Sequence, residues 1–347
     1  MRCDILYIRV IATLLVVLGH SEFYDGFSGF RSEMIPGIND NTIWNLLCRI
    51  IYSFHMALFF GISGALVAYS SEKKGVESFH FSVFLKKKIN RLLFPFFVIT
   101  FFYALPIKFI TGRYEFANIE NALYESVLTV DGTHTWFMLA LFWCMLLGGG
   151  ILLMEKKNFK IHPIIIVVLF FHIVGIPTFV PEFLKWFCIP KFLRFVVFFI
   201  MGYYLEKYKK SVYLQKLITI PLVFPILVFI IVEILYIDGS MPHGGFWGPK
   251  LNQFVQDIIG FLALLLSYNI TTLIKIQHTG KIIKFLDKHS YEIYLYSEPI
   301  NYFILFYCVC VGGWYWGDGF LFWTRFFITL FGAIIISLIV RFNFGQK

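Results

Sequence analysis

Charged residues are scarce in this chain, and polar stretches long enough to form a soluble domain are missing. Only 15% of its 347 residues are charged, whereas 59% are hydrophobic and the mean hydropathy is +0.75. A soluble domain of ordinary composition contains about half apolar residues. The apolar residues also come in blocks of about twenty, the length that crosses a bilayer. These features exclude a soluble protein and predict a polytopic membrane protein.

The sequence also lacks any cysteine pattern typical of a structural site. Its six cysteines include no Cys-x-x-Cys pair and lie mostly in apolar segments, at Cys3, Cys48, Cys144, Cys188, Cys308 and Cys310. A disulfide framework or a zinc site is therefore not expected, and we expect no metal. No small-residue cleavage site follows the first apolar run, so this run is predicted to be a retained span rather than a signal peptide.

Ten apolar segments are predicted to be helices of one membrane bundle. They cover residues 5–24, 45–70, 90–111, 134–154, 161–181, 190–206, 214–236, 250–272, 288–312 and 319–341. The longest predicted loops, 23–44, 71–89 and 112–133, are too short for a soluble domain. The predicted fold is therefore an all-α membrane helix bundle that forms a single domain over residues 1–347.

The basic residues are distributed unevenly between alternate loops. Twenty Lys and Arg lie in one set, and five lie in the other, at Arg31, Arg113, Lys185, Lys191 and Lys250. Because cytoplasmic loops carry the excess of Lys and Arg, both termini are predicted to be cytoplasmic. The net charge of +9 is explained by this topology. We therefore expect the lipid bilayer, and no nucleic acid, as a partner; the sequence leaves a homo-oligomer open.

The first predicted helix carries a polar residue near each end, Arg9 and His20. Eleven residues advance an α-helix by about 1,100°, so both side chains lie on one face, roughly 16 Å apart. The loop charges place Arg9 toward the cytoplasm and His20 toward the outside. Ionisable groups in an apolar helix are costly in lipid and usually serve a function within a bundle. The alternative is that Arg9 snorkels to the interface and His20 only ends the helix.

The second and fourth predicted helices contribute further candidates. His55 lies near mid-membrane, where a functional or network role is as well supported as none. Gly61, Ser63 and Gly64 form a small-residue surface, for which helix packing is the favoured explanation. Trp136 begins the fourth helix at the outer surface, where tryptophan is typical of the interfacial belt.

Two carboxylates lie within the later apolar segments. Asp257 lies toward the outside and either pairs with another charge or lines a cavity. Glu298 falls near the bilayer centre, one residue before the helix-kinking Pro299. A buried carboxylate is either neutral or paired with a cation, and Arg325 and His55 are candidate partners.

A basic cluster precedes the third predicted helix. Lys88 and Arg91 are three residues apart and therefore neighbours on one helix face. One interpretation is an anchor for anionic lipid headgroups. The other is a cytoplasmic phosphate site, because clustered cations at a helix start suit an anionic cofactor.

Taken together, these motifs resemble the acyltransferase family 3 of integral-membrane proteins, which includes O-antigen, capsule and nodulation-factor O-acetyltransferases. The resemblance rests on Arg9 and His20 and on the segments 54–64, 88–95, 135–137, 198–203 and 291–294. Two positions depart from the family pattern. The usual Arg-x-x-Arg is Lys88-x-x-Arg91, and the histidine often found three residues after Tyr294 is replaced by Ser297, followed by Glu298.

The resemblance implies acyl transfer, usually of acetyl from acyl-CoA, to a hydroxyl of a glycan or lipid-linked sugar in the bacterial inner membrane. His20 matches the family's essential histidine and is our candidate general base, because imidazole titrates near neutral pH. Glu22, Asp257 and Glu298 are candidates to orient it. Arg9 is a candidate to bind the donor or the tetrahedral oxyanion.

The remaining assignments follow the same hypothesis. Lys88, Arg91 and Arg9 are predicted to bind acyl-CoA, with Glu298 as a third catalytic residue beside His20 and Arg9. The predicted acceptor-binding residues are His55, Ser63, Trp136 and Asp257. The alternative function is a transporter or flippase that uses Glu298, Asp257 and His55 within the bundle, although a single proline interruption is weak evidence for a transporter.

Overall fold

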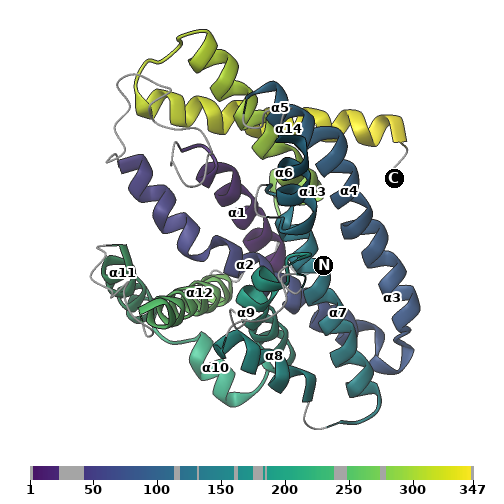
Figure 1. Ribbon diagram of the computed structural model, residues 1–347. Helices are drawn as coiled ribbons and strands as arrows, with labels where there is room; N and C mark the ends of the chain where they lie inside the picture. Colours follow the sequence, from purple (N-terminus) through teal and green to yellow (C-terminus); the bar gives the residue numbers. More distant parts are fainter. Residues whose placement is uncertain are drawn as a thin grey trace. The chain divides into compact units, whose positions relative to one another are not determined.

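The computed structural model describes residues 3–22, 43–112, 118–130, 133–159, 163–174, 183, 186–237, 248–273 and 279–344. Within these ranges the regular elements are all helices, which confirms the predicted all-α class. Figure 1 shows them in sequence colours. The predicted helix ends at residue 24 and at residues 175–181 lie outside the described ranges.

A helix occupies each of the ten predicted ranges. The ten are represented by α1 (Cys3–Gly19), α2 (Ile43–Lys74), a helical stretch from α3 to α5 (Phe81–Lys88 to Leu105–Ile110), α7 (Trp136–Lys156), α8 (Pro163–Val174), α9 (Ile189–Tyr208), α10 with α11 (Val212–Ile218 and Val223–Ile237), α12 (Gly248–Leu273), α13 (Lys281–Ile304) and α14 (Asp318–Phe344). The π-helical turn η8 (Leu305–Val311) continues α13, and the short 3₁₀ turn η2 (Val76–Ser78) precedes α3.

Five described helices are long and apolar enough to cross a membrane. They are Ile43–Lys74, Phe81–Ile110, Trp136–Lys156, Lys250–Thr271 and Asp318–Arg341, and α10 with α11 forms a sixth candidate that is bent by 67°. Large apolar side chains on these helices are exposed, as on Phe102 at 81% and Phe94 at 65%. This surface suits lipid and supports a multi-pass membrane protein. Ten spans and cytoplasmic termini stay predictions.

The third predicted helix begins earlier than residue 90. Helix α3 runs directly into α4 (Phe94–Ile99) through the π-helical turn η3 (Ile89–Leu93), and the two form one continuous ribbon in Figure 1. A second π-helical turn, η4 (Thr100–Ala104), leads on to α5. Lys88 and Arg91 therefore lie inside a helix and not at its start. The predicted placement of this basic pair at the start of the third helix is therefore wrong, and the phosphate site stays a prediction.

Two further local predictions are corrected by the structure. The predicted loop 112–133 contains α6 (Ile119–Leu123) and the π-helical turn η6 (Tyr124–Leu128). This stretch lies between two apolar blocks and was predicted to be a loop, but Ala122 and Ser126 are both buried, four residues apart on one helix face. The predicted helix 214–236 breaks between α10 and α11, where Pro221 supplies no backbone N–H.

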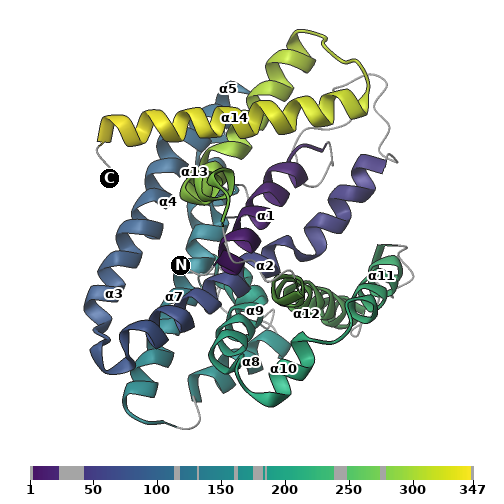
Figure 2. The ribbon, with the colours of Figure 1, turned by 180° about the vertical axis from the view of Figure 1, so that it is seen from behind.

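The chain divides into two compact units. The first comprises Met1–His55, Pro106–Ala117 and Pro221–Lys347, and the second comprises Met56–Leu105 and Asn118–Ile220. In the first unit, α13 packs against α1 and α14, and α11 packs against α12, as both views show (Figures 1 and 2). In the second unit, α7 packs against α9 and α3, and α8 packs against α9.

Within the second unit, α2 and α9 approach so closely that only glycine fits between them. A Cβ atom on Gly64 would lie 1.9 Å from the backbone oxygen of Phe199, and one on Gly202 would lie 1.9 Å from the oxygen of Gly61. The small-residue surface predicted in the second helix is therefore a packing surface. Ser63 is half-buried beside it.

We expect Gly64→Ala and Gly202→Ala to destabilise the second unit, because the added methyl group forces two backbones apart. Overpacking of this kind costs about 1–3 kcal/mol, which thermal unfolding in detergent would detect as a lower Tm. Gly280→Ala is the matched control, since its Cβ would meet nothing within 4 Å. An unchanged Tm for both packing variants would contradict this helix contact.

Candidate functional site

The end of α1 is held by a buried arginine. Helix α1 ends at Gly19, and the His20 amide still donates to the Val16 oxygen at 3.0 Å. The guanidinium of Arg325, which is 2% exposed, donates to the carbonyl oxygens of His20 at 3.1 Å and Ser21 at 3.2 Å. The last carbonyls of a helix need partners from outside it, and a cation is favoured at a helix C-terminus. Arg325 on α14 therefore caps α1 and fixes the backbone of His20.

The imidazole of His20 is half-buried and contacts a tyrosine of α2. Its Nδ1 lies 3.2 Å from the Tyr52 hydroxyl, and the two rings meet edge to face with centroids 6.0 Å apart. If Nδ1 carries the hydrogen and donates to Tyr52, the Nε2 lone pair is left to accept a proton. The contact is therefore compatible with the tautomer that a general base requires.

Glu298 lies in the same polar cluster. Its carboxylate accepts a hydrogen bond from the Tyr302 hydroxyl at 3.2 Å and is close enough to Tyr52 to act on it electrostatically. Arg325 acts electrostatically on both tyrosines. We refer to His20, Tyr52, Glu298, Tyr302 and Arg325 as the His20 cluster. It contains one candidate base, one carboxylate and one buried cation.

A second buried cation borders the His20 cluster. Lys108 is 1% exposed, and its ammonium lies 5.0 Å from the centroid of the Tyr302 ring. Glu22, two residues after His20, is also buried and acts electrostatically on Arg325. Glu22 is therefore a compensating charge for the guanidinium of Arg325, and a buried charge requires such a partner.

Arg9 lies on α1, eleven residues before His20, and is already paired. Its Nε donates to the Asp287 carboxylate of α13 at 2.6 Å, and the pair also forms a salt bridge. The side chains of Arg9 and Asp287 are 20% and 10% exposed. This ion pair ties α1 to α13, and the predicted binding of a donor by Arg9 stays a prediction.

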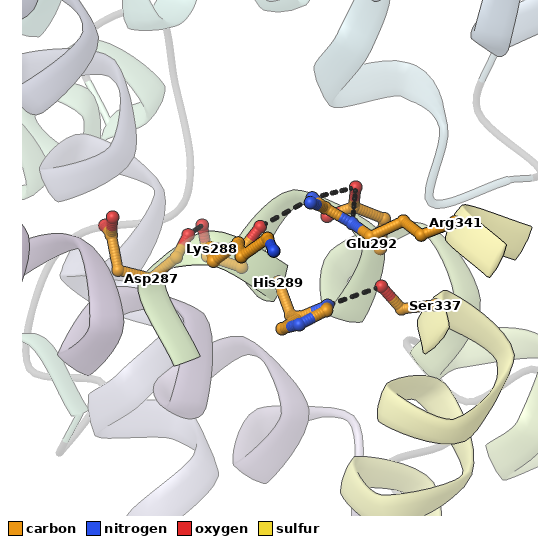
Figure 3. A network of polar contacts seen from close by, with 7 residues as sticks. Asp287, Lys288, His289, Glu292, Ser337 and Arg341 are labelled. Carbon is orange, nitrogen blue, oxygen red and sulfur yellow. Dashed lines mark hydrogen bonds and ion pairs between the residues drawn. The ribbon is translucent and has the colours of Figure 1, made fainter. Parts of the chain in front are cut away.

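A polar network continues from Asp287 along α13 to α14 (Figure 3). Arg341 donates to the Glu292 carboxylate at 2.5 Å and to the Lys288 carbonyl at 2.7 Å. His289 meets the Ser337 hydroxyl at 2.8 Å. Asp287 lies at one end of the network and Arg341 at the other, so these contacts fix α13 along its first turns.

The other candidates of the first unit have separate surroundings. His55 is 3% exposed, and its Nδ1 donates to the Ile51 carbonyl at 2.7 Å, while its ring meets Tyr52 with centroids 5.0 Å apart. Asp257 is half-buried on α12, which packs against α1. His55 thus lies next to the His20 cluster through Tyr52. The hydrogen bond of Glu298 to Tyr302 involves neither of its two predicted partners, Arg325 and His55.

The remaining predicted site residues belong to the second unit. Lys88 is half-buried with its ammonium 5.1 Å from the Phe84 ring centroid, and Arg91 is exposed. Trp136 stacks on Phe195 with ring centroids 5.5 Å apart. The ammonium of Lys191 lies 5.1 Å from the Trp136 centroid. Trp136 is thus part of a packed aromatic group and not only an interfacial anchor.

Sequence reasoning missed three polar residues around the site. Tyr52, Lys108 and Asp287 had no signal of their own, because tyrosines are frequent in this chain and lysines or aspartates near helix ends resemble loop charges. A helical projection would have placed Tyr52 and His55 three residues apart on one face. Within the described ranges, no group of three or more His, Cys, Asp or Glu side chains could hold a metal ion.

Comparison with known families gives one match. A family model described as an acyltransferase domain, of the acyltransferase 3 type, matches residues 4–342, nearly the whole chain. Neither the curated proteins nor the solved structures contain a match to this chain.

We expect Arg325→Met to lower the free energy of unfolding by about 3–5 kcal/mol, because it leaves two carbonyls and buried acidic charge without their cation. Arg325→Lys keeps the charge but not the two-pronged contact, and its loss should be smaller. Chemical or thermal unfolding in detergent measures both. The control is Lys210→Met, which breaks the exposed pair with Glu72 and should cost under about 1 kcal/mol. Equal losses for Arg325→Met and Lys210→Met would refute the capping role.

Proposed function

The chain belongs to the acyltransferase 3 family, and on that premise we propose that it moves an acyl group from acyl-CoA to a sugar hydroxyl. We infer acetyl as the acyl group, cytoplasmic acyl-CoA as the donor, and a cell-surface glycan or lipid-linked sugar of a bacterial inner membrane as the acceptor. The observation that carries the proposal is the His20 side chain, bonded to Tyr52 at a backbone position fixed by Arg325.

The proposed reaction exchanges a thioester for an ester. The acceptor oxygen attacks the thioester carbonyl carbon while His20 Nε2 removes its proton. The tetrahedral intermediate then loses the CoA sulfur, which breaks the carbon–sulfur bond. The imidazolium gives its proton to the thiolate, directly or relayed through water, so His20 becomes neutral again and CoA leaves as a thiol. The net products are the acylated sugar and free CoA.

Tyr52 and Glu298 support the proposed base in different ways. When His20 Nδ1 donates to Tyr52, the tyrosine hydroxyl can direct its own proton to an acceptor beyond it. The carboxylate of Glu298 supplies negative charge near this hydroxyl, and such charge favours the imidazolium that forms during transfer. We therefore assign Glu298 to orientation and electrostatic support rather than to proton abstraction.

The proposed donor site lies at Lys88 and Arg91. Both carry positive charge at the end of a stretch that also contains Lys86 and Lys87, and clustered cations suit the phosphates of CoA. Lys88 is half-buried and Arg91 is exposed, so an anionic ligand can reach the pair from solvent. Since Asp287 already neutralises Arg9, we give Arg9 the role of holding α1 against α13.

Transport is a weaker proposal for this chain. A transporter would use Glu298, Asp257 and His55 as coupling residues within the bundle, but the family match points to an acyltransferase. His55 and Glu298 also have hydrogen-bond partners, Ile51 and Tyr302. We keep His55, Ser63, Trp136 and Asp257 as proposed contacts of the acceptor.

We expect His20→Ala to abolish acyl transfer while the protein still inserts and folds. Tyr52→Phe removes the hydroxyl that contacts His20 Nδ1 and should lower kcat by about 10–100-fold, because the imidazole of the proposed base is then less firmly oriented. Purified protein with labelled acetyl-CoA and a panel of sugars measures both. His80→Ala, at an exposed histidine before α3, serves as the control. Wild-type transfer that persists in His20→Ala would refute the base assignment.

The donor site predicts a selective effect on acyl-CoA. Lys88→Ala with Arg91→Ala should raise the KM for acyl-CoA by about tenfold or more, because each charged contact to phosphate contributes more than 1 kcal/mol. The KM for the acceptor should stay unchanged, and the wild-type KM for acyl-CoA should rise with salt. Lys216→Ala, an exposed lysine on α10, is the control. Unchanged donor KM in the double variant would favour a lipid-headgroup anchor instead.

A further inference from the structure

Asn301 of α13 carries a buried amide that has no hydrogen-bond partner among the described residues. The side chain is 2% exposed, and neither its Oδ1 nor its Nδ2 has a hydrogen bond within the described residues. An asparagine amide offers two donor hydrogens and an oxygen with two lone pairs. None of this capacity is used within the part of the chain that the structure describes.

An unused amide at this position is costly. Leaving a buried donor or acceptor unsatisfied forfeits its hydration, and the penalty grows where lipid surrounds the helix and water is excluded. A leucine of similar shape would avoid it. Buried polar groups of this kind need an explanation, and a ligand that supplies the missing partners is one.

The neighbours of Asn301 identify the chemistry of that ligand. Asn301 follows Glu298 by three residues, so the two side chains share one face of α13. Tyr302 is the next residue, and it bonds Glu298 while the buried ammonium of Lys108 lies over its ring. One stretch of α13 thus contains a buried amide close to the carboxylate and the aromatic ring that α13 contributes to the His20 cluster. A sugar has vicinal hydroxyls, which need both donors and acceptors, and an apolar ring face, which packs on aromatic side chains.

We propose that Asn301 binds a hydroxyl pair of the sugar acceptor and, with Glu298, decides which hydroxyl reaches His20. The amide oxygen accepts from one sugar hydroxyl and the amide nitrogen donates to its neighbour. This subsite rests on the proposed acyltransferase function and deepens it, because it assigns the acceptor to the part of α13 that lies next to the candidate base. Asn301 acts here as a specificity-determining residue and takes no part in proton transfer.

The test uses the full-length protein with acetyl-CoA and the methyl glycosides of glucose, galactose, rhamnose and N-acetylglucosamine as acceptors. We expect Asn301→Leu to raise the KM for the best glycoside by about tenfold or more, the factor that corresponds to 1.4 kcal/mol. The KM for acetyl-CoA should stay within about twofold of wild type. The same substitution should raise Tm without ligand, because it removes the unsatisfied amide.

If Asn301 had only a structural role, its substitution would change Tm and leave both KM values unchanged. The control is Ser126→Ala in the second unit, which also removes a buried side-chain oxygen without a partner, and should raise Tm without changing either KM. The glycoside should also raise the Tm of wild type but not of Asn301→Leu. If Asn301→Leu does not fold, Asn301→Ala replaces it in both measurements.

The outcomes separate this subsite from the function on which it rests. Wild-type transfer with an unchanged acceptor KM in Asn301→Leu would overturn the subsite and leave the acyltransferase proposal standing. A wild-type protein that acylates none of the glycosides and releases no CoA would contradict the proposed function, and the subsite with it.

Discussion

The buried guanidinium of Arg325 is the contact on which the candidate site depends. It binds the carbonyls at the end of α1, so the backbone of His20 is held by a residue more than three hundred positions away in sequence. Side-chain contacts to Tyr52 then orient the imidazole. Because a cation buried in a helix bundle needs compensating charge, Glu22, which acts electrostatically on Arg325, becomes part of the same arrangement. The Arg325 guanidinium therefore both fixes the backbone of the proposed base and determines which acidic group lies near it.

Lipid as a solvent explains why polar groups of the first unit gather in few places. Backbone and side-chain groups that cannot reach water must find partners inside the protein. Arg9 with Asp287 and Arg341 with Glu292 hold α13 against α1 and α14 along one stretch. The His20 cluster serves the same need near the other end of α1. Asn301 differs from these groups because its amide has no partner within the described residues, which is why it points to a ligand.

Local sequence patterns predicted which segments are helical better than they predicted the residues at which those helices begin and end. Apolar blocks located a helix in each of the ten predicted ranges, because hydrophobicity of the required length is a local property. The segment 119–128 was missed because it contains no apolar block of that length, whereas the residues that it buries are known only after folding. The same applies to Lys88 and Arg91. Their spacing predicted that they lie on one helix face, but their position inside a continuous helix follows from α3, which precedes the predicted helix.

The sequence by itself determined the all-α class, the apolar segments, the family resemblance and the choice of His20 as the residue of interest. These follow from composition, periodicity and motif order, which need no knowledge of distant contacts. Only the tertiary structure decided that Arg9 pairs with Asp287, that Tyr52 contacts His20, and that Arg325 caps α1. Each of these contacts joins residues of different helices. The physical reason is that helix packing, and not spacing along the chain, selects the partner that each costly polar group finds.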